Sequence, residues 1–168
     1  KGTLFHFVLQ HLQLHDALDF QSILSQLQDM VNQGLLTEEE KQVISISHLV
    51  SFSRSPLAER MRKALLLKKE VPFVMGVPVE TLYSELQVIS EEEFILVQGM
   101  IDCYFEEEDG IVLVDYKTDF VPDGNIEIIK KRYQIQMDLY TKAIEQITGK
   151  KVKEKILYLF SVNETVNV

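Results

Sequence analysis

The stretch that decides the fold is Gln98–Thr118, QGMIDCYFEEEDGIVLVDYKT. It predicts two β-strands joined at Asp109-Gly110, because Asp-Gly between two apolar runs is a strong signal for a two-residue hairpin turn. Charged side chains inside strands of this kind require an explanation, since an unpaired charge in a protein interior costs several kcal/mol. The hairpin and its charges are therefore the first candidate for a functional site.

The predicted pairing brings the charges together. With Asp109-Gly110 as the loop, Glu108 is opposite Ile111, and Asp102 is opposite Lys117. Side chains alternate between faces, so Asp115 shares a face with Lys117 and is the diagonal neighbour of Asp102. A slip of one residue would move Asp102 to the other face. Two carboxylates beside an ammonium group predict a site for Mg²⁺ or Mn²⁺, the chemistry that phosphodiester hydrolysis requires.

Composition is typical of a folded soluble chain. The sequence has 168 residues, of which 46% are hydrophobic and 26% charged, which predicts one domain with a substantial core. No apolar run is long enough to cross a membrane. Cys103 is the only cysteine, which excludes internal disulfides and a four-cysteine iron–sulfur cluster, and suits a cytoplasmic location. The sequence starts at Lys1, which suggests a fragment of a longer protein.

The net charge of −9 argues against a free-standing nucleic-acid binder. Tethering to a DNA-binding machine would supply the missing affinity through effective concentration. Local basic clusters are present, and each is also explained as a solvated helix face: Arg60, Arg62, Lys63, Lys68 and Lys69; Lys130, Lys131 and Arg132; Lys150, Lys151, Lys153 and Lys155.

Apolar periodicity predicts a helical part over residues 1–70 and a sheet core over residues 71–168. Thr37 to Glu40 form a capping box, and Ser55-Pro56 opens a further helix. The second part is expected to hold strands near residues 69–75, 94–106, 111–117 and 156–160, a helix over 126–147 closed by Gly149, and a loop over 122–125. Residues 81–89 fit no single element. This order predicts an α+β fold, a mixed sheet flanked by helices.

Further candidate residues lie outside the hairpin. Tyr133, Gln136 and Tyr140 are spaced to share one helix face, which suits a contact with DNA and is equally common in a core. His6 lies among apolar neighbours on the first predicted helix, where a lone histidine is more often a core or surface residue than a metal ligand. Glu70 by itself is an ordinary helix-end glutamate. Residues 106–108, three glutamates, are expected to form a solvated hairpin tip.

Several motifs in order resemble the RecB-family nuclease domains of the PD-(D/E)XK superfamily, in particular those of AddA-type helicase–nucleases. They are Gly-Thr-Leu-Phe-His at 2–6, Glu-Val-Pro-Phe at 70–73, Gly-Met-Ile-Asp at 99–102, Val-Asp-Tyr-Lys-Thr at 114–118, and Tyr-Gln-Ile-Gln-Met-Asp-Leu-Tyr at 133–140. The resemblance spans nearly the whole chain. A lone Asp-x-Lys is weak, but five motifs in the family's order are specific. The implied fold is a restriction-endonuclease-like core with an N-terminal helical region.

The resemblance also implies roles for individual residues. The implied metal ligands are His6, Asp102, Asp115 and the main-chain carbonyl of Tyr116. The implied catalytic residues are Asp102, Asp115, Lys117, Gln136 and Tyr140. Accessory or DNA-binding positions are Glu70, Tyr133, Lys130 and Arg132.

By the same resemblance, the chain is expected to be a Mg²⁺- or Mn²⁺-dependent exonuclease module acting on the 3′-terminated strand during double-strand-break repair and recombination. The implied partners are single-stranded DNA delivered by a helicase and an AddB-type subunit. No phosphate-binding Gly-x-x-x-x-Gly-Lys motif occurs in the sequence, so any use of ATP belongs to a helicase part outside it. Two alternatives stay open: a stand-alone PD-(D/E)XK nuclease or resolvase, and a catalytically inactive docking domain.

Overall fold

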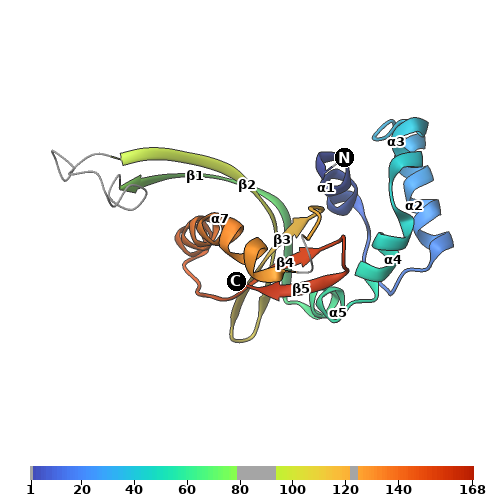
Figure 1. Cartoon of the computed structure of the whole chain (residues 1–168). Helices are drawn as coiled ribbons and strands as arrows, with labels where there is room; N and C mark the ends of the chain where they lie inside the picture. The colour runs from blue at the N-terminus through green and yellow to red at the C-terminus, as the bar shows by residue number, and fades with distance from the viewer. Residues whose placement is uncertain (1, 79–93, 122–124) are drawn as a thin grey trace.

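The computed structural model describes residues 2–78, 94–121 and 125–168. Helices come first in the chain, and a five-stranded sheet follows (Figure 1). The N-terminal helices are α1 (Gly2–His11), α2 (Phe20–Asn32), α3 (Glu38–Val43), α4 (Ile46–Ser53) and α5 (Pro56–Lys63). The later elements are β1 (Leu66–Pro78), β2 (Phe94–Glu107), β3 (Gly110–Lys117), α7 (Ile126–Thr148), β4 (Val152–Leu159) and β5 (Glu164–Asn167). The predicted α+β class is confirmed, with β1 starting at Leu66, earlier than expected.

Local signals in the sequence set several boundaries. Thr37 and Glu40 form the predicted capping box at the start of α3. The hydroxyl of Ser55 accepts from the Ala58 amide and Pro56 occupies the first turn of α5, where the missing N–H of proline costs nothing. Gly149 ends α7 in the left-handed conformation, as its position predicted.

The sheet has the order β1-β2-β3-β4-β5. All neighbours are antiparallel except β3 and β4, which are parallel and are connected through α7. One face of the sheet packs against the N-terminal helices and the other against α7, giving two hydrophobic cores. Val112, Val114 and Tyr116 of β3 belong to the first core, and Ile111 and Leu113 to the second. Alternation along β3 therefore places Asp115 and Lys117 toward α7.

The predicted register of the β2–β3 hairpin is wrong by two residues. Glu107 pairs with Gly110 and Cys103 with Val114, so one further step along the ladder brings Asp102 opposite Asp115, not Lys117. The reason is Gly110, which has φ +146° and no room for a Cβ, because the Lys151 carbonyl would lie 3.0 Å away. Glycine is thus required at the first ladder position. A shift of two residues preserves the face of every side chain.

The β1–β2 ribbon bends at Glu70. This residue has φ +50°, and the pairing passes from Lys69–Cys103 to Val71–Ile101 around it. Cys103 packs in the core of the N-terminal helices, whereas Ile101 packs in the core of α7. The bend therefore turns the ribbon over at Asp102, the residue opposite Glu70, and the outer part of β1 and β2 extends away as a long arm (Figure 1).

The remaining differences from the sequence-based expectations concern β5 and two segments of the chain. Strand β5 was not expected, since only Val166 of its residues is buried. Residues 81–89 and most of the 122–125 loop lie outside the described residues. Within the described ranges, none of the helices combines the length and hydrophobicity that a membrane span needs.

Candidate functional site

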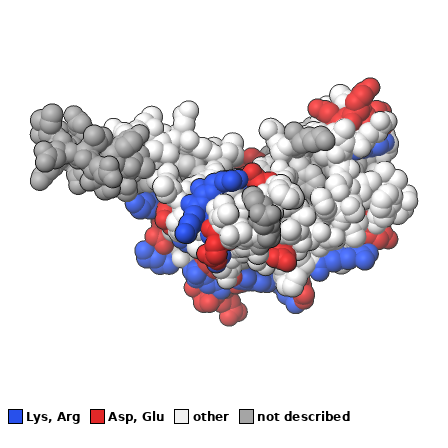
Figure 2. Space-filling view, in the orientation of Figure 1, with Lys and Arg blue, Asp and Glu red and all other residues white. Residues whose placement is uncertain are grey.

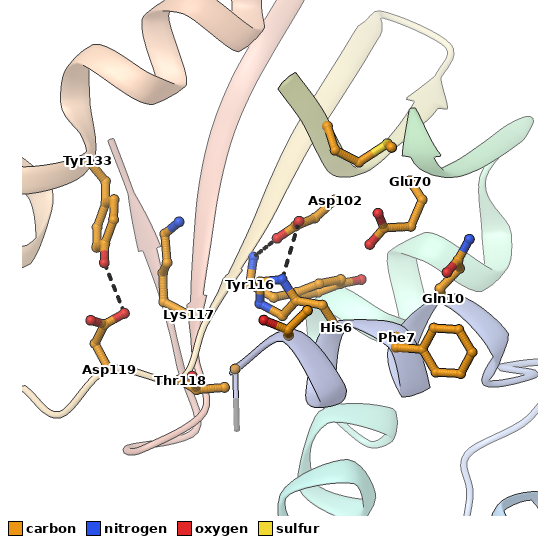
Figure 3. A pocket seen from close by; sticks show the side chains of 13 residues that line it. His6, Phe7, Gln10, Glu70, Asp102, Tyr116, Lys117, Thr118, Asp119 and Tyr133 are labelled. Atoms are coloured by element: carbon orange, nitrogen blue, oxygen red, sulfur yellow. Dashed lines mark hydrogen bonds and ion pairs between the residues drawn. The ribbon is translucent and has the colours of Figure 1, made fainter. Parts of the chain in front are cut away.

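A cleft of about 470 Å³ opens at the bend of the β1–β2 ribbon. Figure 3 shows how charged and polar side chains converge on it from several elements. The lining includes six of the residues that the sequence singled out: His6, Glu70, Asp102, Tyr116, Lys117 and Tyr133. Asp115, Gln136 and Tyr140 lie behind this lining and are linked to it through Lys117.

Asp102 is the point at which α1 meets the sheet. Its Oδ2 accepts a hydrogen bond of 2.8 Å from the Tyr116 amide, and its Oδ1 lies 3.5 Å from His6 Nδ1. Burial raises the pKa of the Asp102 carboxyl, while His6, the Tyr116 amide and Lys117 oppose the rise. The two carboxyl oxygens are thus directed toward a histidine and the β3 backbone at the bottom of the cleft.

Asp115 is 2% exposed, and its environment is unfavourable for a negative charge. Burial and then the Asp102 carboxylate raise its pKa to about 6, although Lys117 opposes them. Asp115 Oδ2 is 2.6 Å from Lys117 Nζ and forms an ion pair with it, but this oxygen accepts no hydrogen bond of good geometry. A buried carboxylate oxygen left without a hydrogen bond is costly in a folded protein.

Lys117 is held from several sides. Its Nζ donates to Gln136 Oε1 at 3.0 Å and lies 4.0 Å from the centroid of the Tyr133 ring, a cation–π contact. Gln136 Nε2 in turn donates to the Tyr140 hydroxyl at 2.8 Å. The predicted polar-aromatic face of α7 therefore fixes the lysine.

Sequence reasoning missed Asp119. Its Oδ2 accepts a 2.9 Å hydrogen bond from the Tyr133 hydroxyl, and its Oδ1 is 3.7 Å from Arg132. This bond holds Tyr133 against Lys117, as Figure 3 shows. The signal was present, because Asp119 continues the every-second-residue series of Asp115 and Lys117.

Glu70 faces the cleft from β1 (Figure 3). A non-glycine residue with positive φ is strained by about 1–2 kcal/mol, and such strain is concentrated at functional sites. Burial raises the pKa of its carboxyl, and the two nearby histidines, His6 and His11, oppose the rise. Glu70 is thus a partly buried acid opposite Asp102.

Two features outside the charged cluster fix its geometry. Lys69 Nζ donates to the carbonyls of Leu9 and Leu12 at 2.9 and 2.8 Å, which anchors the end of α1, the helix of His6, to β1. A Cβ on Gly99 would lie 2.8 Å from the Phe73 ring, and that ring packs on Tyr140. The glycine of the Gly-Met-Ile-Asp motif therefore leaves space for a ring that supports the Gln136–Tyr140 pair.

Other candidates lie elsewhere. Lys130 pairs with Glu127 at 3.3 Å and does not line the cleft. Arg132 reaches only the rim, through Asp119. The expectation of a solvated hairpin tip is wrong for two of its glutamates. Glu106 is 9% exposed and pairs with Lys150, while Glu107 pairs with Arg60 and Lys153.

The chemical types of the side chains in the cleft suit a hard divalent cation. Burial raises the pKa of both carboxyls, and Asp102 raises that of Asp115 further; a divalent ion, which prefers oxygen ligands, would relieve this cost. Among the described residues, no three His, Cys, Asp or Glu side chains are grouped so that they could hold a metal. Asp115 is directed to Lys117, and Asp102 is directed to the Tyr116 amide.

Comparisons with known proteins show the family of the chain. Residues 1–167 match the family described as the PD-(D/E)XK nuclease superfamily. The A component of the ATP-dependent helicase/nuclease of Thermoanaerobacter sp. is 49% identical over 160 residues, covering 95% of this chain and 13% of that protein. The proteins of the same name from Alkaliphilus oremlandii and Acetivibrio thermocellus are 44% and 45% identical, covering 100% and 95% of this chain, and 14% and 12% of their own lengths. The chain thus spans only a small part of these relatives.

Proposed function

Because the chain belongs to the PD-(D/E)XK nuclease superfamily, we propose that it hydrolyses phosphodiester bonds in DNA with Mg²⁺ or Mn²⁺, as the nuclease module of an AddA-type helicase–nuclease. The observation that carries the proposal is the pair of buried carboxylates, Asp102 and Asp115, beside the ammonium group of Lys117. A protein gains nothing in stability from such a group of charges. A site that binds a cation and a phosphate does need it.

In this proposal, His6, Asp102, Asp115 and the Tyr116 carbonyl hold the metal. The ion would lower the pKa of a bound water and neutralise charge on the scissile phosphate. The contribution of the protein is to keep the ligands dry and close, with Asp102 fixed by the 2.8 Å bond from the Tyr116 amide.

Lys117 is proposed to stabilise the negative charge that develops on the phosphate. Turned toward the cleft, its ammonium group donates to an oxygen of the phosphate, where negative charge develops as water attacks. Gln136 and the Tyr133 ring limit its freedom, so its ammonium group stays beside the cleft. Tyr140 acts through Gln136, and we assign Gln136, Tyr140 and Tyr133 as positioning residues.

Glu70 is the proposed proton acceptor. As the oxygen of the attacking water bonds to phosphorus, the bond from phosphorus to the leaving oxygen breaks. The proton of the water must go to a base, and the leaving oxygen takes up a proton from solvent water. The raised pKa of Glu70 makes it a better base than an ordinary exposed carboxylate.

The finer parts of the proposal rest on the relatives and the motif resemblance. They are exonuclease action on the 3′-terminated strand, delivery of single-stranded DNA by a helicase, an AddB-type partner, and a role in double-strand-break repair. ATP would be used by the helicase part. The proposed unit is residues 1–168 as a single nuclease domain. Against an inactive docking domain stand the buried charges, which such a domain would not need.

The direct test is the cleavage of a 5′-labelled single-stranded oligonucleotide by the chain, in Mg²⁺ or Mn²⁺ and in EDTA. We expect cleavage that requires the metal and falls at least about 100-fold in Lys117→Ala. The matched control is Lys153→Ala, which removes a lysine that also contacts carboxylates, at the hairpin tip. Equal rates in the wild type and Lys117→Ala would reject the proposed site, and metal-independent cleavage would reject the proposed chemistry.

A further inference from the structure

A second groove of about 440 Å³ adjoins the cleft. Its polar lining comes from the end of α1 and the chain after it, from α5 and from β1: Gln10, Gln13, His15, Arg62 and Lys69. Gln10 lines both the cleft and this groove, and Lys69 of the groove precedes Glu70 of the cleft. Gln10 also lies one helical turn beyond His6, on the same face of α1. The groove therefore continues the path of the cleft.

The groove carries positive charge and, among the described residues, has no acidic side chain in its lining. Figure 2 shows acidic and basic side chains next to one another along the lower part of the visible face. In this chain of net charge −9, most described lysines and arginines lie within 4.0 Å of a carboxylate oxygen: Lys41, Arg60, Lys63, Lys117, Lys130, Arg132, Lys150, Lys151, Lys153 and Lys155. Arg62 and Lys69 have no such partner among the described residues, and no aspartate or glutamate lines the groove. The groove thus holds two positive charges without a countercharge.

The two cations differ in what they can offer a ligand. Lys69 Nζ already donates to the carbonyls of Leu9, Gln10 and Leu12, so it contributes charge but no further hydrogen bond. Burial lowers the pKa of Lys69, and a nearby anion would relieve this cost. Arg62 uses one nitrogen to donate to the Ser53 carbonyl at 2.7 Å, and the remaining edge of its guanidinium group is available to a ligand.

We propose that this groove binds a backbone phosphate of the nucleic-acid strand whose scissile phosphate lies in the cleft. Arg62 donates to the phosphate oxygens, as arginine does in paired contacts to this group. Lys69 adds its charge, and Gln10 borders the strand where it passes from the cleft into the groove. This inference rests on the proposed function and adds a direction to it, because the strand then runs from the metal ligands along α1 toward α5.

The test is the salt dependence with which the chain binds a fluorescent single-stranded oligonucleotide, with Ca²⁺ in place of Mg²⁺ to suppress cleavage. Arg62→Gln removes the charge and keeps an amide that can donate to the Ser53 carbonyl. Arg62→Lys keeps the charge. Lys142→Gln is the matched control, because Lys142 is an exposed lysine of α7 without a carboxylate partner among the described residues. Thermal unfolding checks that each variant is folded.

We expect Arg62→Gln to bind several-fold more weakly at low salt and to lower the slope of log affinity against log salt by about 0.7, the value for one phosphate on a single strand. Arg62→Lys should keep the wild-type slope, and so should Lys142→Gln. Hydrolysis of the small ester thymidine 5′-p-nitrophenyl phosphate should be the same in Arg62→Gln and the wild type, since this substrate has no second phosphodiester.

An unchanged slope in Arg62→Gln, an equal loss in Lys142→Gln, or no binding by the wild type at low salt would overturn the inference. Failure of the proposed function has a different signature. In that case the wild type would hydrolyse neither the ester nor the oligonucleotide in Mn²⁺, whatever the binding slopes show.

Discussion

The two ends of the β2–β3 hairpin differ in how they stabilise negatively charged side chains. At the tip, Glu107 accepts hydrogen bonds of 2.9 and 3.1 Å from Arg60, and Lys153 lies 2.6 Å from it. These contacts, the hydrogen bond from Arg60 first, lower the pKa of Glu107 to about 2. Arg60 also bridges to Glu154 of β4, so the tip is a closed network that joins α5 to the sheet.

At the other end, burial and Asp102 raise the pKa of Asp115 to about 6, and one of its oxygens has no hydrogen bond. The two carboxylates share a single close lysine and a histidine. Acidic residues on the same strands are visible in the sequence at both ends, so charge alone does not mark a site. The acidic side chain at the tip is fully paired within the protein, whereas the Asp115 carboxylate in the cleft remains in an environment that disfavours its charge.

The largest difference between the two ends should appear in the matched pair Asp115→Asn and Glu107→Gln. Each change removes one negative charge and preserves the shape of the side chain. We expect metal-dependent cleavage to fall at least about 100-fold in Asp115→Asn and to change less than about twofold in Glu107→Gln. Initial rates on a single-stranded oligonucleotide measure both. Similar rates in the two variants would remove the distinction between the ends.

The same aspartate should oppose stability when no metal is bound. The folded-state pKa of about 6 lies above the ordinary value of 3.8, so the folded protein binds this proton more tightly, and stability falls as pH rises from about 4 to about 6. Asp115→Asn should therefore gain roughly 2–3 kcal/mol at pH 7.5 in EDTA, and nothing below about pH 4. Chemical unfolding at the two pH values measures this difference. A loss of stability at pH 7.5 would contradict the conclusion that the buried Asp115 carboxylate destabilises the folded protein.

A smaller effect is expected from the positioning of Lys117. Asp119→Ala and Tyr133→Phe each break the same 2.9 Å hydrogen bond, and each should lower the rate about tenfold. The double variant should be no slower than either single variant, because both act through one contact. Affinity for Mn²⁺ should stay unchanged in all three. Multiplicative losses in the double variant would show that the two residues act separately. A further variant, Arg132→Ala, tests whether Asp119 acts through Arg132 instead.

The smallest effect should come from the tip. Glu107→Gln should lose about 1 kcal/mol at pH 7, because the pairs are partly exposed and screened by solvent. The low pKa of Glu107 places this contribution above about pH 4.5, and it disappears as pH falls toward 2. The stability difference between this variant and the wild type should therefore vanish in acid. A difference that persists at pH 2 would mean that Glu107 contributes by packing rather than by charge.

The sequence predicted those parts of the fold and the site that depend on local pattern. Alternation along the strand placed Asp102, Asp115 and Lys117 on one face, and this survived a register error of two residues. The spacing of Tyr133, Gln136 and Tyr140 on α7 predicted a shared face, although not that Gln136 and the Tyr133 ring contact Lys117.

The features that escaped prediction depend on contacts between distant segments. The positive φ of Glu70 arises where β1 pairs with β2 around Asp102, and no local signal encodes that bend. Gly110 was assigned to the turn because the Lys151 carbonyl that crowds it belongs to a segment about 40 residues later. The paired state of Glu107 depends on Arg60 and Lys153 in the same way.

The two carboxylates of the cleft should bind a divalent cation, and those of the hairpin tip should not. Calorimetric titration with Mn²⁺ of the wild type, Asp115→Asn and Glu107→Gln measures this difference without relying on catalysis. We predict that the wild type and Glu107→Gln bind Mn²⁺ alike and that Asp115→Asn loses the binding. Undiminished binding in Asp115→Asn would show that the cleft carboxylates are not the metal ligands.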